Sequence, residues 1–222
     1  MKIEKLKKII PENVYSHIEK RIVEFRPGQV KSIESGLFNN KNILVCTPTA
    51  SGKTLIAEML FLNTVLNKKG KTIYVVPLKA LASEKYSDFK KLYEIHDFKV
   101  GVSSGDLDKS DAYLRDYDLI ITTSEKLDSL LRHKVDWIND VKSVVIDEVH
   151  LLNDVGRGPT LEVVITLLRQ LIKDIQLLCL SATIGNVKEL AGWLDSEIVE
   201  DTWRPVELHK GIYLDSKIDF FK

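Results

Sequence analysis

Residues 47–54 read Thr-Pro-Thr-Ala-Ser-Gly-Lys-Thr, a small-residue run that ends in a lysine and a hydroxyl. An apolar run at 43–46 precedes it and an amphipathic segment follows, which predicts a strand, a loop and a helix. Backbone N–H groups at such a helix start face a β-phosphate, and a lysine reaches the β- and γ-phosphates. The Thr54 hydroxyl can coordinate magnesium, and Gly52 permits close approach of the backbone. This pattern is typical of a phosphate-binding loop.

The general pattern of this loop has a glycine where this chain has Thr47. A strand, a turn and a helix with a surface lysine would explain the Gly-Lys-Thr triplet alone. The flanking strand and helix favour the phosphate loop. On this interpretation the nucleotide is held by Thr47, Pro48, Thr49, Ala50, Ser51, Gly52, Lys53 and Thr54.

Two adjacent acids, Asp147 and Glu148, directly follow the apolar run 144–146. A carboxylate at this place would hold magnesium, usually through water, and its neighbour would orient or deprotonate an attacking water. An isolated Asp-Glu pair could instead form a solvated turn. A phosphate loop, however, needs an acidic partner on a neighbouring strand end. We therefore predict that Asp147 binds the metal together with Thr54, and that Glu148 is catalytic along with Lys53.

A second apolar run at 177–180 ends in Ser181-Ala182-Thr183. Two hydroxyls at a strand end can be turn formers and nothing more. Next to the acidic strand, they could also hydrogen-bond His150 and sense whether the γ-phosphate is present. We expect His150 in the catalytic set, with Ser181 and Thr183 as coupling residues.

The elements that must position these residues alternate along the chain. Continuous apolar runs predict strands covered on both faces, and helix-period segments lie between them. This order predicts an α/β fold with a mostly parallel sheet, helices on both faces and all carboxyl ends of the strands on one edge. Residues 1–24 are expected to form a short amphipathic helix before the sheet. The predicted strands are 43–47, 72–77, 100–103, 119–122, 144–147 and 177–180, and the helices include 54–66, 80–93, 124–131 and 161–172.

Composition narrows the class of protein. Of 222 residues, 44% are apolar and 29% charged, which excludes collagen-like, low-complexity and disordered chains. The 32 basic and 32 acidic residues balance, so net charge gives no argument for nucleic acid. Cys46 and Cys179 lie in apolar runs and are expected to be buried thiols. No apolar stretch is long enough for a membrane span, and the charged start is not a signal peptide. We expect a soluble, cytoplasmic protein that does not contact a membrane.

The order of the motifs resembles that of superfamily 2 helicases, with motifs I, II and III at 52–54, 147–150 and 181–183. In that family the first position of the phosphate loop varies, so Thr47 is compatible with it. Residues 25–29 (Phe-Arg-Pro-Gly-Gln) resemble the Q motif, in which a glutamine, here Gln29, reads the adenine edge. Together with segments like motifs Ia (74–82) and Ib (122–130), a Gly-Asp element (104–106) and Trp-Arg-Pro-Val (203–206), the pattern resembles the archaeal Ski-type DNA repair helicases, relatives of the polymerase theta helicase.

The resemblance implies a single RecA-like P-loop NTPase domain at 25–208 with ATP and Mg²⁺ as cofactors. It also implies 3′ to 5′ translocation on single-stranded DNA and unwinding of forked DNA. The family's motor has two RecA-like domains, and the second supplies an arginine finger. Too few residues follow Thr183 for a second such domain. Residues 209–222 are therefore expected to begin the connection to that missing domain, and the isolated chain to be a monomer that hydrolyses ATP poorly and unwinds nothing.

Motifs Ia and Ib lie at strand ends that lead into helix N-termini, where N–H groups and hydroxyls suit phosphate oxygens. From the family we expect Lys79, Thr123 and Ser124 to contact nucleic acid, with Lys126 and Arg132 as electrostatic helpers. Three tryptophans are interpreted separately: Trp203 as a base-stacking, a core or a domain-junction residue, and Trp137 and Trp193 as core.

Two alternatives remain open at this stage. Motifs I to III do not distinguish DNA from RNA, so an RNA helicase or RNP remodeller of the same superfamily also fits. A stand-alone nucleotide-binding module that regulates a partner is the alternative outside the helicases.

Overall fold

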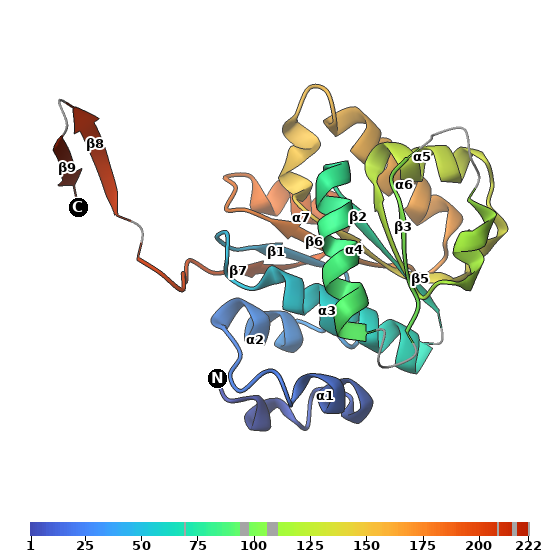
Figure 1. The fold of residues 1–222 in the computed structure, drawn as a ribbon, viewed down its shortest axis with the longest axis horizontal. Helices are drawn as coiled ribbons and strands as arrows, with labels where there is room; N and C mark the ends of the chain where they lie inside the picture. Colours follow the sequence, from blue (N-terminus) through green and yellow to red (C-terminus); the bar gives the residue numbers. More distant parts are fainter. Residues whose placement is uncertain (69, 94–97, 106–110, 208, 215–216, 222) are drawn as a thin grey trace.

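The computed structural model describes residues 1–68, 70–93, 98–105, 111–207, 209–214 and 217–221. Within them, seven parallel strands form one sheet in the order β3-β4-β2-β5-β6-β1-β7 (Figure 1). The predicted α/β fold is confirmed. The strands are β1 (Ile43–Cys46), β2 (Lys71–Val76), β3 (Val100–Ser103), β4 (Leu119–Thr123), β5 (Val141–Ile146), β6 (Gln176–Ser181) and β7 (Glu197–Glu200).

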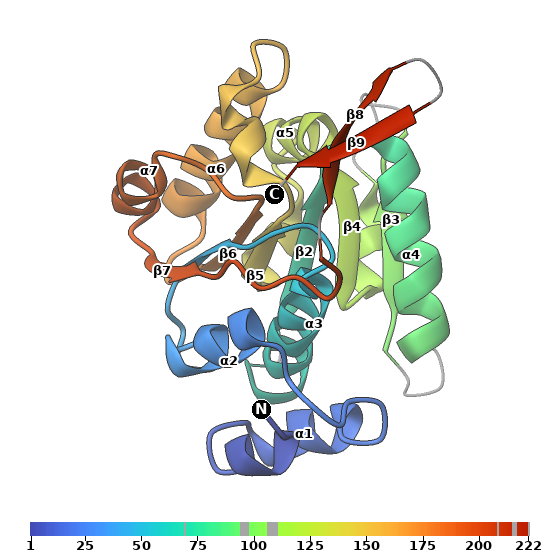
Figure 2. The same cartoon turned by 90° about the vertical axis from the view of Figure 1, so that its left-hand side faces the viewer.

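Helices cover both faces of the sheet (Figures 1 and 2). On one face lie α2 (Pro27–Glu34), α3 (Lys53–Asn63) and α4 (Lys79–Tyr93), with α1 (Glu12–Ile18) packed against α3. On the other face lie α5 (Ser124–Arg132), α6 (Gly158–Leu171) and α7 (Val187–Leu194). Short helical turns complete the fold: the 3-10 turns η1 (Ile3–Leu6), η4 (Ala112–Asp116), η5 (Asp136–Asp140) and η6 (Val149–Asn153), and the π-helical η2 (Thr64–Lys68).

The strands read as continuous apolar runs because successive side chains enter two different cores. In β1, Ile43 and Val45 belong to the core under α2, α3 and α4, whereas Leu44 and Cys46 belong to the core under α5, α6 and α7. In a strand covered on both faces, side chains on both sides are buried, so apolar residues are favoured at successive positions. Both cysteines are buried free thiols, as expected.

The parallel connections bring the predicted site residues to one edge of the sheet. β6 lies between β5 and β1, so the acidic segment, the Ser181 segment and the phosphate-loop segment follow three neighbouring strands. The backbone N–H of Thr47 donates to the carbonyl oxygen of Ser181, at 3.3 Å. Because the strands are parallel, their carboxyl ends lie at the same edge of the sheet, where such sheets bind ligands.

The amino-terminal segment differs from the single helix expected for residues 1–24. It contains η1 and α1, and Pro11 stands at the N-cap of α1 because its ring cannot continue a preceding helix. The segment is fixed to the domain by Arg21, which pairs with the buried carboxylate of Glu58 on α3. Tyr93 on α4 donates its hydroxyl to the same carboxylate.

Three strands were not predicted. β7 joins the edge of the sheet with three of its four side chains exposed, so it lacks the apolar run of a central strand. β8 (Lys210–Leu214) and β9 (Lys217–Phe221) form an antiparallel hairpin that extends away from the sheet (Figure 1). Large apolar side chains on this hairpin, including Tyr213, Ile218 and Phe220, are exposed.

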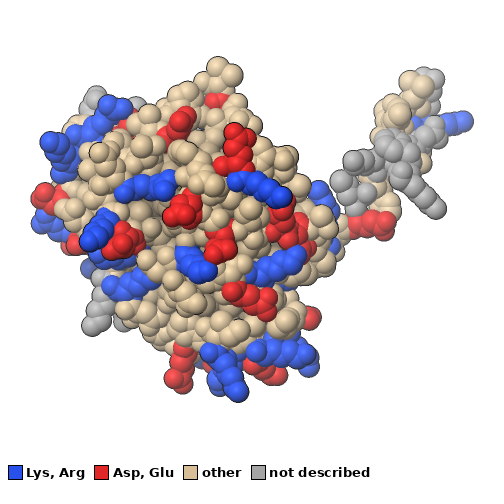
Figure 3. Space-filling view, turned by 180° about the vertical axis from the view of Figure 1, so that it is seen from behind, with Lys and Arg blue, Asp and Glu red and all other residues tan. Residues whose placement is uncertain are grey.

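Two properties of the surface bear on function. Basic and acidic side chains are interspersed on the face seen in Figure 3, in keeping with the balanced net charge. In the described ranges, no helix combines the length and the apolar character needed to cross a bilayer.

Candidate active site

The phosphate-loop segment bends back on itself between β1 and α3. Ala50 and Gly52 adopt left-handed backbone conformations, with φ of 63° and 91°. A Cβ at Gly52 would lie 2.4 Å from Nε2 of Gln29, and residues with a Cβ rarely adopt a φ of 91°, so the bend favours glycine. Inside the loop the hydroxyls of Thr47 and Ser51 lie 2.8 Å apart. The loop therefore leads directly into the N-terminus of α3, where backbone N–H groups suit a phosphate.

Lys53 is the first residue of α3 and its ammonium lies inside the loop. It donates to the carbonyl oxygens of Thr47, at 2.9 Å, and Pro48, at 3.4 Å. Burial lowers the pKa of Lys53, while the nearby carboxylates of Glu148 and Asp147 act in the opposite direction. The predicted lysine and both predicted acids thus share one electrostatic environment.

The acidic pair is held in a defined geometry after β5. One oxygen of Asp147 accepts from the backbone N–H of Glu148 and the other from the hydroxyl of Tyr74, both at 3.1 Å. Burial, followed by the charge of Asp147, raises the pKa of Tyr74 well above its ordinary value. Glu148 has φ of 53°, a left-handed conformation that is rare for a residue with a Cβ and that recurs at functional sites. Tyr74 was within a motif of the sequence but was not predicted to contact the acid.

The two predicted coupling residues differ in how far they are exposed to solvent. Ser181 is buried at the end of β6, and Thr183 is exposed. Neither forms a hydrogen bond with Nδ1 of His150 in the part of the chain that the structure describes. That nitrogen lies 3.3 Å from Oε2 of Glu148 instead. The structure therefore brings His150 to the acidic pair, and the expected contact to the hydroxyls is not formed.

Gln29, on α2, is buried beside the loop. Its Nε2 donates to the carbonyl oxygen of Gly52 at 3.0 Å, and its Oε1 accepts from the backbone N–H of Arg26 at 2.9 Å. The guanidinium of Arg26 donates to the carbonyl oxygen of Ala50 and lies 5.3 Å from the ring centroid of Trp203. Two side chains of the predicted Q motif, Arg26 and Gln29, thus donate hydrogen bonds to two backbone carbonyl groups of the loop. Arg26 lay in the motif, but nothing in its spacing pointed to Trp203.

A second lysine reaches the site from α4. Nζ of Lys85 donates to Oγ1 of Thr54 at 3.1 Å. Thr54 is the hydroxyl that the sequence predicted as a metal ligand. Sequence reasoning missed Lys85 because the residue belongs to a different strand–helix unit, and no spacing links it to the loop.

The predicted nucleic-acid residues divide into exposed and buried positions. Lys79 is exposed at the start of α4. Thr123 and Ser124 are buried at the start of α5, where the Thr123 hydroxyl accepts from the backbone N–H of Lys126 at 3.4 Å and caps the helix. The Thr123 hydroxyl is therefore part of the helix start, and Ser124 beside it is buried, so neither side chain is a free surface group.

Lys126 differs from its prediction as a surface helper. Only 1% of the residue is exposed, and its ammonium pairs with Asp111 at 3.1 Å. In this position the ammonium cannot contact a nucleic-acid strand at the protein surface. Arg132 is exposed but pairs with Asp128, at 2.8 Å. Part of the expected Gly-Asp element, Asp106, lies outside the described residues.

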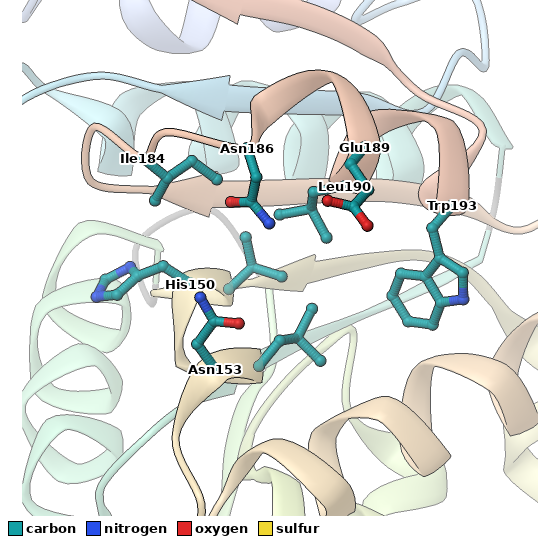
Figure 4. A pocket seen from close by; sticks show the side chains of 9 residues that line it. His150, Asn153, Ile184, Asn186, Glu189, Leu190 and Trp193 are labelled. Atoms are coloured by element: carbon teal, nitrogen blue, oxygen red, sulfur yellow. The ribbon is translucent and has the colours of Figure 1, made fainter.

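The three tryptophans lie in different environments. Trp137 is in the core, as predicted, whereas Trp193 is 37% exposed and lines a cavity. This cavity, of about 180 Å³, lies between η6 and α7. Figure 4 shows His150 and Trp193 at opposite ends of it, with Asn153, Asn186 and Glu189 between them. Trp203 is also 37% exposed and contacts Arg26, so it is not a core residue.

Comparison with known proteins gives the family. Residues 26–190 match the model of the DEAD/DEAH box helicase. The chain is 56% identical to the ATP-dependent DNA helicase Hel308 of Methanocaldococcus jannaschii over 90% of its length, and 46% identical to that of Thermococcus kodakarensis over 100%. It spans 17% and 20% of these relatives.

Solved structures agree with these relatives. The helicase MrfA bound to DNA and AMPPNP matches with a TM-score of 0.73 and 28% identity. The match covers 88% of this chain and 30% of that one. A second crystal structure of the helicase MrfA matches with a TM-score of 0.72. Since the family model matches more than half of the residues, the chain belongs to the DEAD/DEAH box helicase family.

Proposed function

We propose that this chain is the first RecA-like motor domain of an ATP-dependent DNA helicase that moves 3′ to 5′ on single-stranded DNA and unwinds forks in DNA repair. The observation that carries the proposal is the placement of the phosphate loop with Lys53 after β1 and of Asp147 and Glu148 after β5, at the same edge of the sheet and separated only by β6. The relatives described as ATP-dependent DNA helicases support it.

The residues of the site fit ATP and Mg²⁺. The bend at Gly52, whose φ of 91° favours glycine, lets the backbone approach a phosphate closely. Lys53 would leave its loop carbonyls for the β- and γ-phosphates, and the oxygens of Thr54 and Asp147 would hold the metal. When bound, Mg²⁺ supplies positive charge against the phosphates. Glu148 would orient the attacking water, and Gln29 would read the adenine edge.

Two classes of contact complete the proposed motor. Lys79 and the helix starts at Thr123 and Ser124 would contact the phosphates of single-stranded DNA, which gives binding with little sequence preference. A second RecA-like domain, which we place in the remainder of the longer polypeptide, would supply an arginine finger worth about 10³–10⁵ in rate. The motor is proposed to act as a monomer in the cytoplasm.

The first test is ATP turnover by this chain, with and without single-stranded DNA, against the Lys53→Ala variant. We expect little turnover above that background, and DNA-stimulated turnover once the second domain is present in the same polypeptide. Rapid DNA-stimulated turnover by this chain alone would contradict the need for the second domain. Preference for single-stranded RNA over DNA in competition would favour an RNA helicase instead.

A further inference from the structure

The contact between Lys85 and Thr54 joins α4 to the phosphate loop. The ammonium lies 3.1 Å from Oγ1 of Thr54, the hydroxyl proposed above as a metal ligand. Lys85 is partly buried, and Thr54 is exposed. A divalent cation on this oxygen would lie within a few ångströms of the ammonium, and like charges that close repel each other. The two cations therefore compete for one oxygen.

The neighbouring residues of the site already carry charges of both signs. Asp147 and Glu148 bring negative charge to the site, and Lys53 is drawn onto the carbonyl oxygens of Thr47 and Pro48. Nucleotide phosphates would add more negative charge beside Thr54. A second ammonium at Thr54 supplies positive charge at the place where the metal would supply it.

We propose that Lys85 is a third cationic side chain of the nucleotide site, alongside Lys53 and the metal, and that it takes the place of the metal on Thr54 when no metal is bound. The inference rests on the proposed nucleotide site. Lys85 supports phosphate binding in the metal-free complex, and it leaves the Thr54 hydroxyl in the metal-bound one. It is a positioning residue in this respect, since it neither attacks nor activates a reacting atom.

The position of Lys85 on α4 extends the consequence of this exchange. Lys79, an expected DNA contact, begins the same helix, about 9 Å away along the helix axis. The same helix thus carries Lys85, which responds to the metal, and Lys79, which is expected to contact the DNA strand. The Lys85–Thr54 hydrogen bond and the backbone of α4 therefore connect Thr54 to the edge that contains motif Ia.

The test compares nucleotide affinity with and without the metal. Binding of a fluorescent ADP analogue is titrated in saturating Mg²⁺ and in EDTA, for the parent chain and for Lys85→Met. In EDTA we expect the variant to lose about 3- to 10-fold in affinity, the range of one net hydrogen bond. In Mg²⁺ the loss should stay below about 2-fold. By linkage, the metal then binds the variant's nucleotide complex more tightly than the parent's.

A matched control separates this effect from general charge. Lys91→Met removes an exposed positive charge from the same helix and should change neither affinity. Equal losses for Lys85→Met in EDTA and in Mg²⁺, or no loss in either, would overturn the inference. If Lys53→Ala loses binding while Lys85→Met behaves like the parent, the nucleotide site stands and only this inference fails. No binding by the parent chain would overturn both.

Discussion

The side-chain amide of Gln29 donates to the carbonyl oxygen of Gly52, so α2 holds the peptide that directly precedes Lys53. Gln29→Ala removes this contact and the proposed contact to adenine. We expect the affinity for ADP to fall about 10-fold, the range of one or two buried hydrogen bonds. The affinity for GDP should fall less, because only the loop contact is lost. Titration with both nucleotides measures this, and equal losses would contradict the adenine contact.

The fit of Gly52 gives a second prediction. Gly52→Ala forces a Cβ toward Nε2 of Gln29 and puts alanine at φ of 91°. We expect nucleotide affinity to fall more than about 10-fold and the free energy of unfolding to fall by about 1–2 kcal/mol. Calorimetry and urea titration measure the two effects.

Gly192→Ala is the matched control for that substitution. Gly192 lies within α7, and a Cβ there would meet no atom within 4 Å. Alanine is favoured over glycine in a helix by about 1 kcal/mol, so this variant should be as stable as the parent or more stable. A loss of nucleotide affinity in Gly192→Ala would show that the effect at position 52 is not local.

The sequence predicted the features that depend on residues close to one another in the chain. The central strands were found because both of their faces are apolar, and the phosphate loop and the Asp147 segment because each directly follows a strand. Contacts between distant segments left no local pattern. The sequence predicts a surface charge at Lys126, because its partner, Asp111, comes near it only in the folded chain. Trp203 reaches Arg26 in the same way.

Glu148 gives a prediction about the chemical step. Glu148→Gln keeps the shape of the side chain but removes the base and the negative charge. We expect ATP turnover in a polypeptide with both motor domains to fall by about 10²–10⁴-fold, the usual contribution of a general base. Nucleotide affinity should stay within about 3-fold of the parent, because the phosphate contacts remain. Unchanged turnover would refute the assigned role.

The buried position of Lys126 predicts an effect on stability rather than on strand binding. Lys126→Met leaves Asp111 without its ammonium partner, and removing one member of a buried pair costs about 3–5 kcal/mol. Because Asp111 keeps 14% of its side chain exposed, we expect the lower end of that range. Urea denaturation measures the change.

Lys79→Met is the comparison for Lys126→Met in DNA binding. Lys79 is exposed, so its loss should lower the slope of log affinity against log salt by about 0.7 for single-stranded DNA. Folded Lys126→Met should keep the slope of the parent. A reduced slope in Lys126→Met with unchanged stability would contradict the buried pair and restore Lys126 as a phosphate contact.

Lys68 gives a prediction about pH. Burial lowers the pKa of Lys68 to about 8, although its ammonium donates to Asn40 at 2.9 Å and to Gln176 at 2.6 Å. In the unfolded chain a lysine titrates near about 10.4. Between these two values the unfolded state binds more protons than the native state, so the free energy of unfolding rises with pH.

The matched variant for this titration is Lys68→Met, which has no ammonium to desolvate. In the parent chain, the free energy of unfolding should rise between about pH 8 and pH 10, because Lys68 loses its proton first in the native state. The unfolding free energy of the parent minus that of the variant should therefore increase over this interval. Urea denaturation of both chains at matched ionic strength measures the difference. If it stays constant with pH, then Lys68 keeps its ordinary pKa, and its contacts with Asn40 and Gln176 compensate fully for its burial.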